Sequence, residues 1–451
     1  MNIRQDTLAR SVVAALGAGV CLVAGGIPGA ALAGPGDHIR FGQTEVVPQI
    51  LLGTQYRSNV LLAEKDVQGG LSLIVHPSAA LKLDGPKMKL QAAGAYDLRK
   101  YFDPDLTSLD RFRDGSLKGD LRLLPDSLLG FDVKESLVGS SRESESWNSD
   151  SALIQHTKND LGARLAIHPG EALEGGLGGR FLIDDYNVPA EANVLLNPNY
   201  NSRLGYGPEA SFKWRFFPRT AVVFDTSMEW FRWNHNLVNI MSDMESLGAD
   251  SPWGDYLAIP DGWLFSVKGG LRGRFTERIT LGLVAGYNDA DYDEASVQED
   301  PGAAAAGVEA DPAVAGFDVD PSGAQKLTVS ALFQYDLSET HKVVLGYDRA
   351  IADSYFTNYF VYDYVFLRYN VLLGARVGVG GEAGYRFENF FGEVTRADNV
   401  VRTRLGLNYS ANRWLQANGS FQWDRRATVE QQYNTVDYDD FGVSLGVTFV
   451  Y

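Results

Sequence analysis

Strict alternation of apolar and polar side chains is the feature that most constrains this chain. The C-terminal segment 441–451 shows it without interruption. Its apolar parity holds Phe441, Val443, Leu445, Val447, Phe449 and Tyr451, and its other parity holds Gly442, Ser444, Gly446, Thr448 and Val450. Because successive side chains of a strand point to opposite faces, this segment is predicted to be a strand with one wholly apolar face. A chain terminus usually frays, so we expect this one to be a structural element.

The same alternation recurs along the whole chain and predicts an all-β fold. Candidate strands begin near residues 47, 69, 87, 113, 128, 155, 172, 204, 220, 262, 278, 326, 341, 356, 371, 399, 414 and 439. We therefore expect about 18 antiparallel strands.

The connections between these strands alternate between short and long. The short ones have turn chemistry, as in Asp84-Gly85-Pro86. The long ones run through segments such as 184–203, 234–262 and 289–325. This sorting is typical of a transmembrane antiparallel β-barrel, in which short turns face the periplasm and long loops face the exterior. A soluble β-sandwich or propeller is the alternative, but it does not sort its loops in this way.

The N-terminus predicts a secretory signal peptide over residues 1–33. Arg4 and Arg10 precede an apolar stretch at 11–26, which is shorter than a membrane helix, and Ala33 ends a small-residue cleavage site. A short membrane anchor is the alternative. Cleavage leaves residues 34–46 as a periplasmic segment before a barrel over residues 47–451. The single cysteine, Cys21, lies in the removed part, so we expect no disulfide and no thiolate metal site. We also expect no other metal site and no cofactor.

If the apolar parity faces lipid, the other parity lines the lumen. An Arg or Lys facing lipid would cost about 2–4 kcal/mol at the membrane midplane, so the charges of this parity indicate a wet lumen. The candidate transit residues are Arg57, Lys89, Arg122, Lys134, Lys213, Arg215, Lys268, Arg272, Arg376, Arg386, Arg402, Arg404, Asp225, Glu229 and Glu382. Arginine recognises carboxylates and stacks on flat faces, so a polar, anionic carbohydrate is the expected cargo. For any single Arg, an ion pair that stiffens the wall is the alternative.

Two further features bear on function. The acidic segment 289–325 is either a solvated surface loop or a flap that folds inward onto lumen arginines. The six histidines are scattered, and the chain has no HExxH, GxSxG or P-loop sequence. We therefore expect no catalytic residues and no enzymatic activity, and nothing in the sequence indicates a nucleic-acid partner.

Three segments of the chain carry a family resemblance: GTQYRSNVLL at 53–62, HPSAALKL at 76–83 and AGAYDLRKYF at 93–102. They resemble the β-barrel porin 2 family of outer-membrane proteins, and the resemblance extends loosely over residues 34–451. It implies an 18-stranded type of barrel in the Gram-negative outer membrane that passes a secreted exopolysaccharide and works with a periplasmic polysaccharide export protein. The alternatives are a general diffusion or nutrient-uptake porin, a barrel-embedded hydrolase, and an adhesin with a structural barrel.

The C-terminal aromatic residues are the expected assembly signal. Outer-membrane proteins resembling this chain end on an aromatic residue that the barrel-assembly machinery reads. Most end in Phe, and this chain instead places Tyr451 after Phe449. We expect the last strand to pair with the first, so that no unpaired edge faces lipid.

Overall fold

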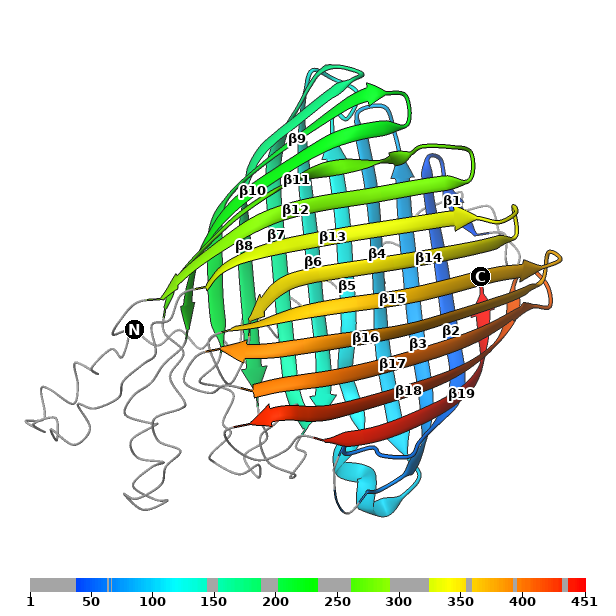
Figure 1. Ribbon diagram of the computed structural model, residues 1–451. Coiled ribbons are helices and arrows are strands. Elements are labelled where there is room, and N and C mark those ends of the chain that lie inside the picture. Colours follow the sequence, from blue (N-terminus) through cyan, green and yellow to red (C-terminus); the bar gives the residue numbers. More distant parts are fainter. Residues whose placement is uncertain are drawn as a thin grey trace, which may run out of the picture.

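The computed structural model describes residues 38–62, 65, 67–143, 153–187, 202–233, 261–292, 324–353, 359–391, 396–431 and 437–451. These residues form long strands that wrap into one barrel (Figure 1). The strands are β1 (Ile39–Phe41), β2 (Thr44–Arg57), β3 (Gly70–Asp84), β4 (Met88–Tyr101), β5 (Arg111–Leu123), β6 (Leu129–Glu143), β7 (Leu153–Gly170), β8 (Leu173–Asn187), β9 (Arg203–Phe217), β10 (Thr220–Trp233), β11 (Gly262–Arg274), β12 (Ile279–Tyr292), β13 (Ala324–Asp336), β14 (His341–Asp353), β15 (Tyr359–Leu373), β16 (Val377–Phe391), β17 (Arg396–Ser410), β18 (Leu415–Gln431) and β19 (Tyr438–Val450). One short 3₁₀ helix, η1 (Pro104–Leu109), follows β4.

The sheet closes on itself. Each strand from β2 to β19 pairs antiparallel with its neighbour in sequence, and β19 pairs with β2 from Gln49↔Val450 to Arg57↔Gly442. The Tyr451 N–H donates to the Pro48 carbonyl at 3.0 Å. The short β1 pairs with the start of β2, beyond the end of β19. The expected closed barrel is therefore confirmed, with β1 as an additional strand.

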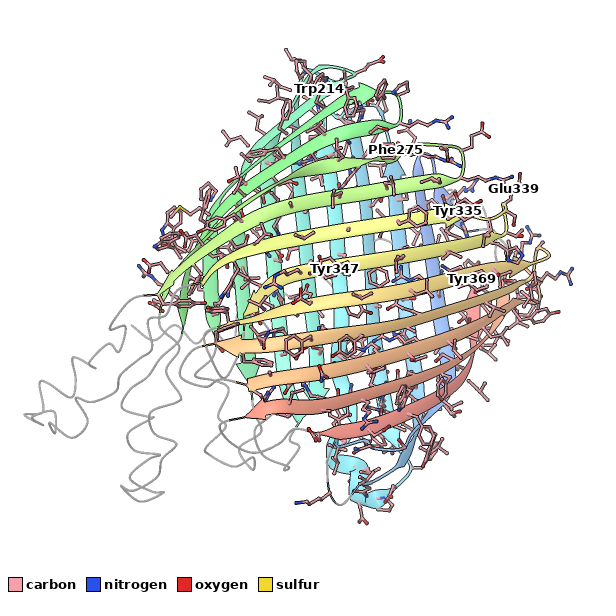
Figure 2. All side chains as sticks on the ribbon, in the orientation of Figure 1. Trp214, Phe275, Tyr335, Glu339, Tyr347 and Tyr369 are labelled. Atoms are coloured by element: carbon pink, nitrogen blue, oxygen red, sulfur yellow. The ribbon has the colours of Figure 1, made fainter. Side chains whose placement is uncertain are left out.

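The outer face of the barrel is apolar. Leu445, Leu177 and Leu327 are 65%, 62% and 60% exposed on it, and on β19 the exposed parity is the one that the alternation predicts. Trp214 and Tyr369 lie toward the end with the short turns, and Tyr347 lies farther along the wall (Figure 2). Aromatic side chains in such places are typical of a membrane interface.

One strand boundary was wrong. The strand expected from residue 371 begins at Val377, because residues 371–373 complete β15 and a tight turn follows. Gly374 has φ of 62°, a left-handed conformation that glycine adopts without strain. The alternation missed this turn because Leu373 and Ala375 continue the apolar parity straight through it. Arg376 therefore lies in an exposed turn and not on the lumen wall.

Some predictions fall outside the described residues. These are the signal peptide with Cys21, its cleavage after Ala33, and the part of the acidic segment over 293–323. Among the residues that the structure describes, no helix is long and apolar enough to cross a membrane.

Candidate functional site in the lumen wall

The strand registers place all candidate transit residues except Arg376 on the inner parity. Pairs directly opposite each other on neighbouring strands share a face, as Asp225↔Lys268 and Glu382↔Arg404 do. On β15 and β16 the parity opposite to Glu382 holds Leu367, which is 51% exposed on the outer face. The prediction of a charged lumen is consistent with this arrangement.

Most of the predicted transit residues are ion-paired with wall neighbours. The pairs are Lys89–Asp126 (3.3 Å), Arg122–Asp120 (3.0 Å), Lys213–Glu174 (3.4 Å), Arg215–Glu174 (3.6 Å), Arg402–Asp424 (3.0 Å), Arg368–Glu382, Arg386–Glu388, Arg203–Glu229 and Arg180–Glu229 (3.4 Å). Pairs that face water contribute little to stability. They do neutralise one another, so these residues form a wall of alternating charge rather than a uniformly basic one.

Arg57 has a structural role that the sequence did not indicate. Asp440 is fully buried and accepts hydrogen bonds from Nε and Nη2 of Arg57 at 3.0 and 2.8 Å. It also accepts from the backbone N–H of Asn59 at 2.9 Å. This pair bridges β2 and β19, so Arg57 secures the seam that closes the barrel.

A second buried network lies nearby and was also missed. Glu388 contacts Arg386 and Arg426, and Asp398 contacts Arg396 at 2.9 Å and Arg426 at 3.0 Å. Both carboxylates are almost completely buried. Arg386 and Glu388, like Arg396 and Asp398, are two residues apart on one strand. Local spacing does not bring Arg426 of β18 to either carboxylate.

A small polar recess brings together three candidates that form no ion pair in the described part of the chain, namely Lys134, Asp225 and Lys268. It has a volume of about 280 Å³ and is lined by Lys134, Arg164, Gly176, Glu209, Ala210, Ser211, Asp225, Thr226, Ser227, Ser266 and Lys268. Within the described part of the chain, Lys134 and Lys268 form no ion pair, and neither do Glu209 and Asp225. The recess thus presents unneutralised charges of both signs.

The register of the strands builds this recess. Ser211, Asp225 and Lys268 lie side by side across β9, β10 and β11. Two residues farther along β10, Ser227 lies opposite Ser266 of β11. Arg164 reaches across from β7, where it pairs with Asp132 at 2.9 Å and donates to Ser211 Oγ at 3.2 Å. Gly176 leaves room for both side chains, because a Cβ there would lie 2.7 Å from Ser211 Oγ and 3.2 Å from Arg164 Cδ.

The recess adjoins a larger cavity along the inner wall. This cavity has a volume of about 950 Å³, and Lys134 and Glu209 line both spaces. Lys118, Asp160 and Arg180 add further charges of both signs. Among the described residues, no group of three or more His, Cys, Asp and Glu side chains could hold a metal ion.

Comparisons with known proteins return structures but no sequences. No family model matches the chain. No curated protein matches it. Among solved structures, the chain is similar to the outer membrane protein OpdK of Pseudomonas aeruginosa, with 12% identity over 90% of this chain and 99% of that chain and a TM-score of 0.44. It is similar to OccAB3 of Acinetobacter baumannii, with 8% identity over 91% and 100% and a TM-score of 0.45. It is similar to the FrpB iron transporter of Neisseria meningitidis, with 8% identity over 90% and 81% and a TM-score of 0.45.

These likenesses concern architecture, and the barrel is established by the strand pairing of the chain itself. The ring from β2 to β19 is closed, large apolar side chains are exposed on its outer face, and ion pairs line its inner face. A sheet that spans a membrane closes into a barrel, because lipid offers the backbone no hydrogen-bond partners. The chain is therefore a closed antiparallel β-barrel with the apolar outer face of a transmembrane barrel.

Proposed function

We propose that this barrel is a passive channel for small polar solutes that carry charges of both signs. The observation that supports this is the lumen recess, where Lys134 and Lys268 stand beside Glu209 and Asp225 without ion-pair partners among the described residues. This is the diffusion or nutrient-uptake alternative, with the class of solute added.

The energetics suit transit better than tight capture. A unit charge 4 Å from its opposite gains about 1 kcal/mol in bulk water and about 4 kcal/mol near a protein surface. A solute with one ammonium and one carboxylate gains from both signs of the recess, while water still solvates all the groups. Conduction needs binding that is strong enough to favour entry and weak enough to allow release.

Exopolysaccharide export with a periplasmic export protein stays a prediction. The resemblance to the β-barrel porin 2 family motivates it, and no contact of the described lumen wall tests it. None of the described residues supports the hypothesis of a barrel-embedded hydrolase. Export is tested by deleting the gene: loss of surface polysaccharide with unchanged solute uptake would favour export over the channel proposed here.

Swelling of proteoliposomes tests the solute class. Alanine, lactate and lactamide are matched in size but are zwitterionic, anionic and neutral. We expect alanine to enter fastest, and the preference to disappear in the Lys268→Gln/Asp225→Asn variant. Lys89→Gln is the control, because Lys89 faces the lumen but pairs with Asp126 outside the recess. Equal rates for the three solutes in the wild type would refute the proposal.

A further inference from the structure

The wall between β13 and β14 is paired over only part of its height. The two strands are in register from Asp336↔Lys342 to Val329↔Arg349, and there the pairing stops. Residues 324–328 of β13 continue in register with β12, and residues 350–353 of β14 continue in register with β15. At the end with the long loops, each of these two strands therefore has an edge without a strand partner among the residues that the structure describes.

The two edges do not meet, because one part of the wall overlaps the other. On β15, Tyr359 and Val361 have the parity of Val365 and Leu367, which are exposed on the outer face, yet they are only 3% exposed. They form one apolar cluster with Phe231 and Tyr292, which have the inner parity of β10 and β12. The outer face of the β14–β16 end thus lies against the inner face of β10–β12.

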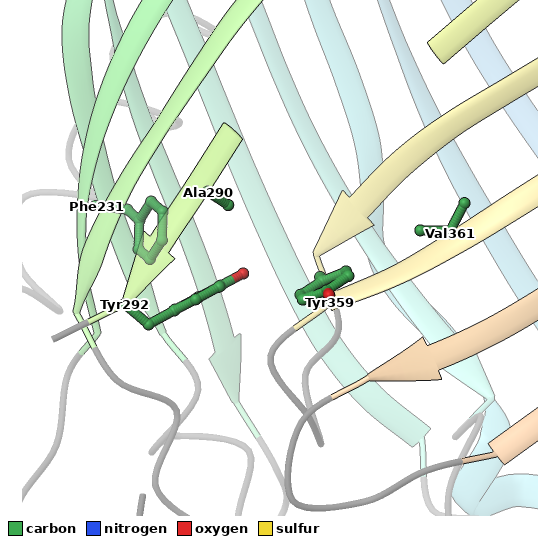
Figure 3. Close-up of a cluster of buried hydrophobic side chains, with 5 residues drawn as sticks. All are labelled: Phe231, Ala290, Tyr292, Tyr359 and Val361. Carbon is green, nitrogen blue, oxygen red and sulfur yellow. The ribbon is translucent and has the colours of Figure 1, made fainter. Parts of the chain in front are cut away.

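A chain of aromatic side chains seals this overlap. Tyr292 points from the end of β12 toward Tyr359 at the start of β15, and their rings stack at 6.2 Å (Figure 3). Phe231 packs on Tyr292 at 5.5 Å, and Phe391 stacks on Tyr359 at 5.2 Å. Lys326 of β13 lies 4.7 Å over the Phe391 ring. The described contacts between the two wall sections here include packed aromatic rings and a cation–π contact.

The seal is incomplete in its polar contacts. Asn288 and Thr328 lie on the inner face of β12 and β13 and are each 5% exposed. Asn288 Oδ1 and Thr328 Oγ1 are buried without a hydrogen-bond partner in the described part of the chain. This overlap opens without breaking any β13–β14 ladder bond, because that ladder stops at Val329↔Arg349. The β5–β6 ladder also stops short of the long loops, at Gly115↔Gly139, but the aromatic cluster lies at the β13–β14 overlap. Such a segment belongs to the part of a fold that opens most easily.

The outer surface beside the overlap combines an apolar site with a cationic one. Leu327 lies in the part of β13 that does not pair with β14, and it is 60% exposed on the outer face. It is in register with Tyr287 of β12, which is exposed on the same face. Arg349, at the last β13–β14 pair, donates through Nη1 to both carboxylate oxygens of Asp363, at 3.0 and 2.9 Å, and its side chain is 37% exposed. An acyl chain along Leu327 with a carboxylate at Arg349 matches this pair of features.

We propose that the β13–β14 overlap is a lateral gate through which a single-chain carboxylate amphiphile passes between the outer leaflet and the lumen. The aromatic cluster closes the gate at rest, and its side chains separate to admit the acyl chain. The polar solute route does not use the gate, so the two activities are separable.

Reversible cross-linking tests the gate. In a Cys21→Ala background, Tyr292→Cys and Tyr359→Cys are joined by a bismaleimide with a cleavable disulfide spacer. Uptake of radiolabelled dodecanoate and of alanine is then measured in porin-deficient cells. We expect cross-linking to reduce dodecanoate uptake to the empty-vector level, cleavage to restore it, and alanine uptake to stay constant. The control pair, Val284→Cys and Ser330→Cys, joins β12 and β13 where they are already paired and should change neither uptake.

A single surface substitution gives a second measurement that does not disturb the aromatic cluster. Arg349→Gln should reduce dodecanoate uptake at low concentration and leave alanine uptake unchanged. The proposal is overturned if the cross-linked protein still takes up dodecanoate at the wild-type rate, or if the wild type does not exceed the empty vector. If the wild type takes up dodecanoate but admits alanine, lactate and lactamide at equal rates, the channel proposal fails and the gate proposal stands.

Discussion

The Arg57–Asp440 pair should be worth several kcal/mol to the closed barrel. The two side chains are 9% and 0% exposed, and Arg57 donates both Nε and Nη2 to one carboxylate oxygen. Asp440→Asn keeps the volume and keeps an oxygen for the Asn59 N–H, but leaves the Arg57 charge buried without its counter-ion. Breaking a buried ion pair lowers the free energy of unfolding by about 3–5 kcal/mol. Because the substituted side chain keeps an oxygen for the Asn59 N–H, we expect Asp440→Asn to lose about 3 kcal/mol.

Urea unfolding in lipid vesicles, followed by tryptophan fluorescence, measures this loss. Asp126→Asn is the matched control, because the Lys89–Asp126 pair is 39% and 71% exposed and should contribute less than about 1 kcal/mol. Removing both charges in Arg57→Gln/Asp440→Asn should cost less than the sum of the single changes. If Asp440→Asn and Asp126→Asn lose the same small amount, the pair does not secure the seam and the reasoning is refuted.

Two further predictions concern assembly and strand packing. Deleting Val450 and Tyr451 removes the bonds from Val450 N–H to the Trp414 carbonyl (2.9 Å) and from Tyr451 N–H to the Pro48 carbonyl (3.0 Å), so the heat-modifiable folded band should be lost in cells; normal assembly would contradict this. Gly207→Ala places a Cβ 1.7 Å from the Met228 carbonyl oxygen and should destabilise the barrel by about 1–3 kcal/mol in the same urea assay. Gly406→Ala, where nothing lies within 4 Å, should change stability much less, and equal losses would contradict the packing argument.

Alternation predicted the barrel well because membrane and lumen impose opposite chemistry on the two faces of every strand. It placed the last strand, its outer parity and its partner β2 correctly. It failed at Gly374, where the apolar parity runs through a turn without a break. Sequence spacing does not predict contacts between side chains that are far apart in the chain, such as Arg57 and Asp440.

The recess and the overlap show two different limits of prediction. Lys134, Lys268 and Asp225 were all predicted to face the lumen, but the register of six strands decides that they share one recess. At Tyr359 and Val361 the parity itself misleads, because their outer face is covered by another part of the wall. A period-two pattern shows the face of a residue but not what covers that face.

Ion selectivity in planar bilayers tests the central claim most directly, namely that the recess charges face a continuous water path. Purified protein would be inserted and its zero-current potential measured across a KCl gradient. The account predicts stable conductance, with Lys134→Glu/Lys268→Glu shifting the potential toward cation selectivity and Asp225→Lys/Glu209→Lys shifting it toward anion selectivity. Absence of conductance, or a potential that neither pair of substitutions moves, would contradict it.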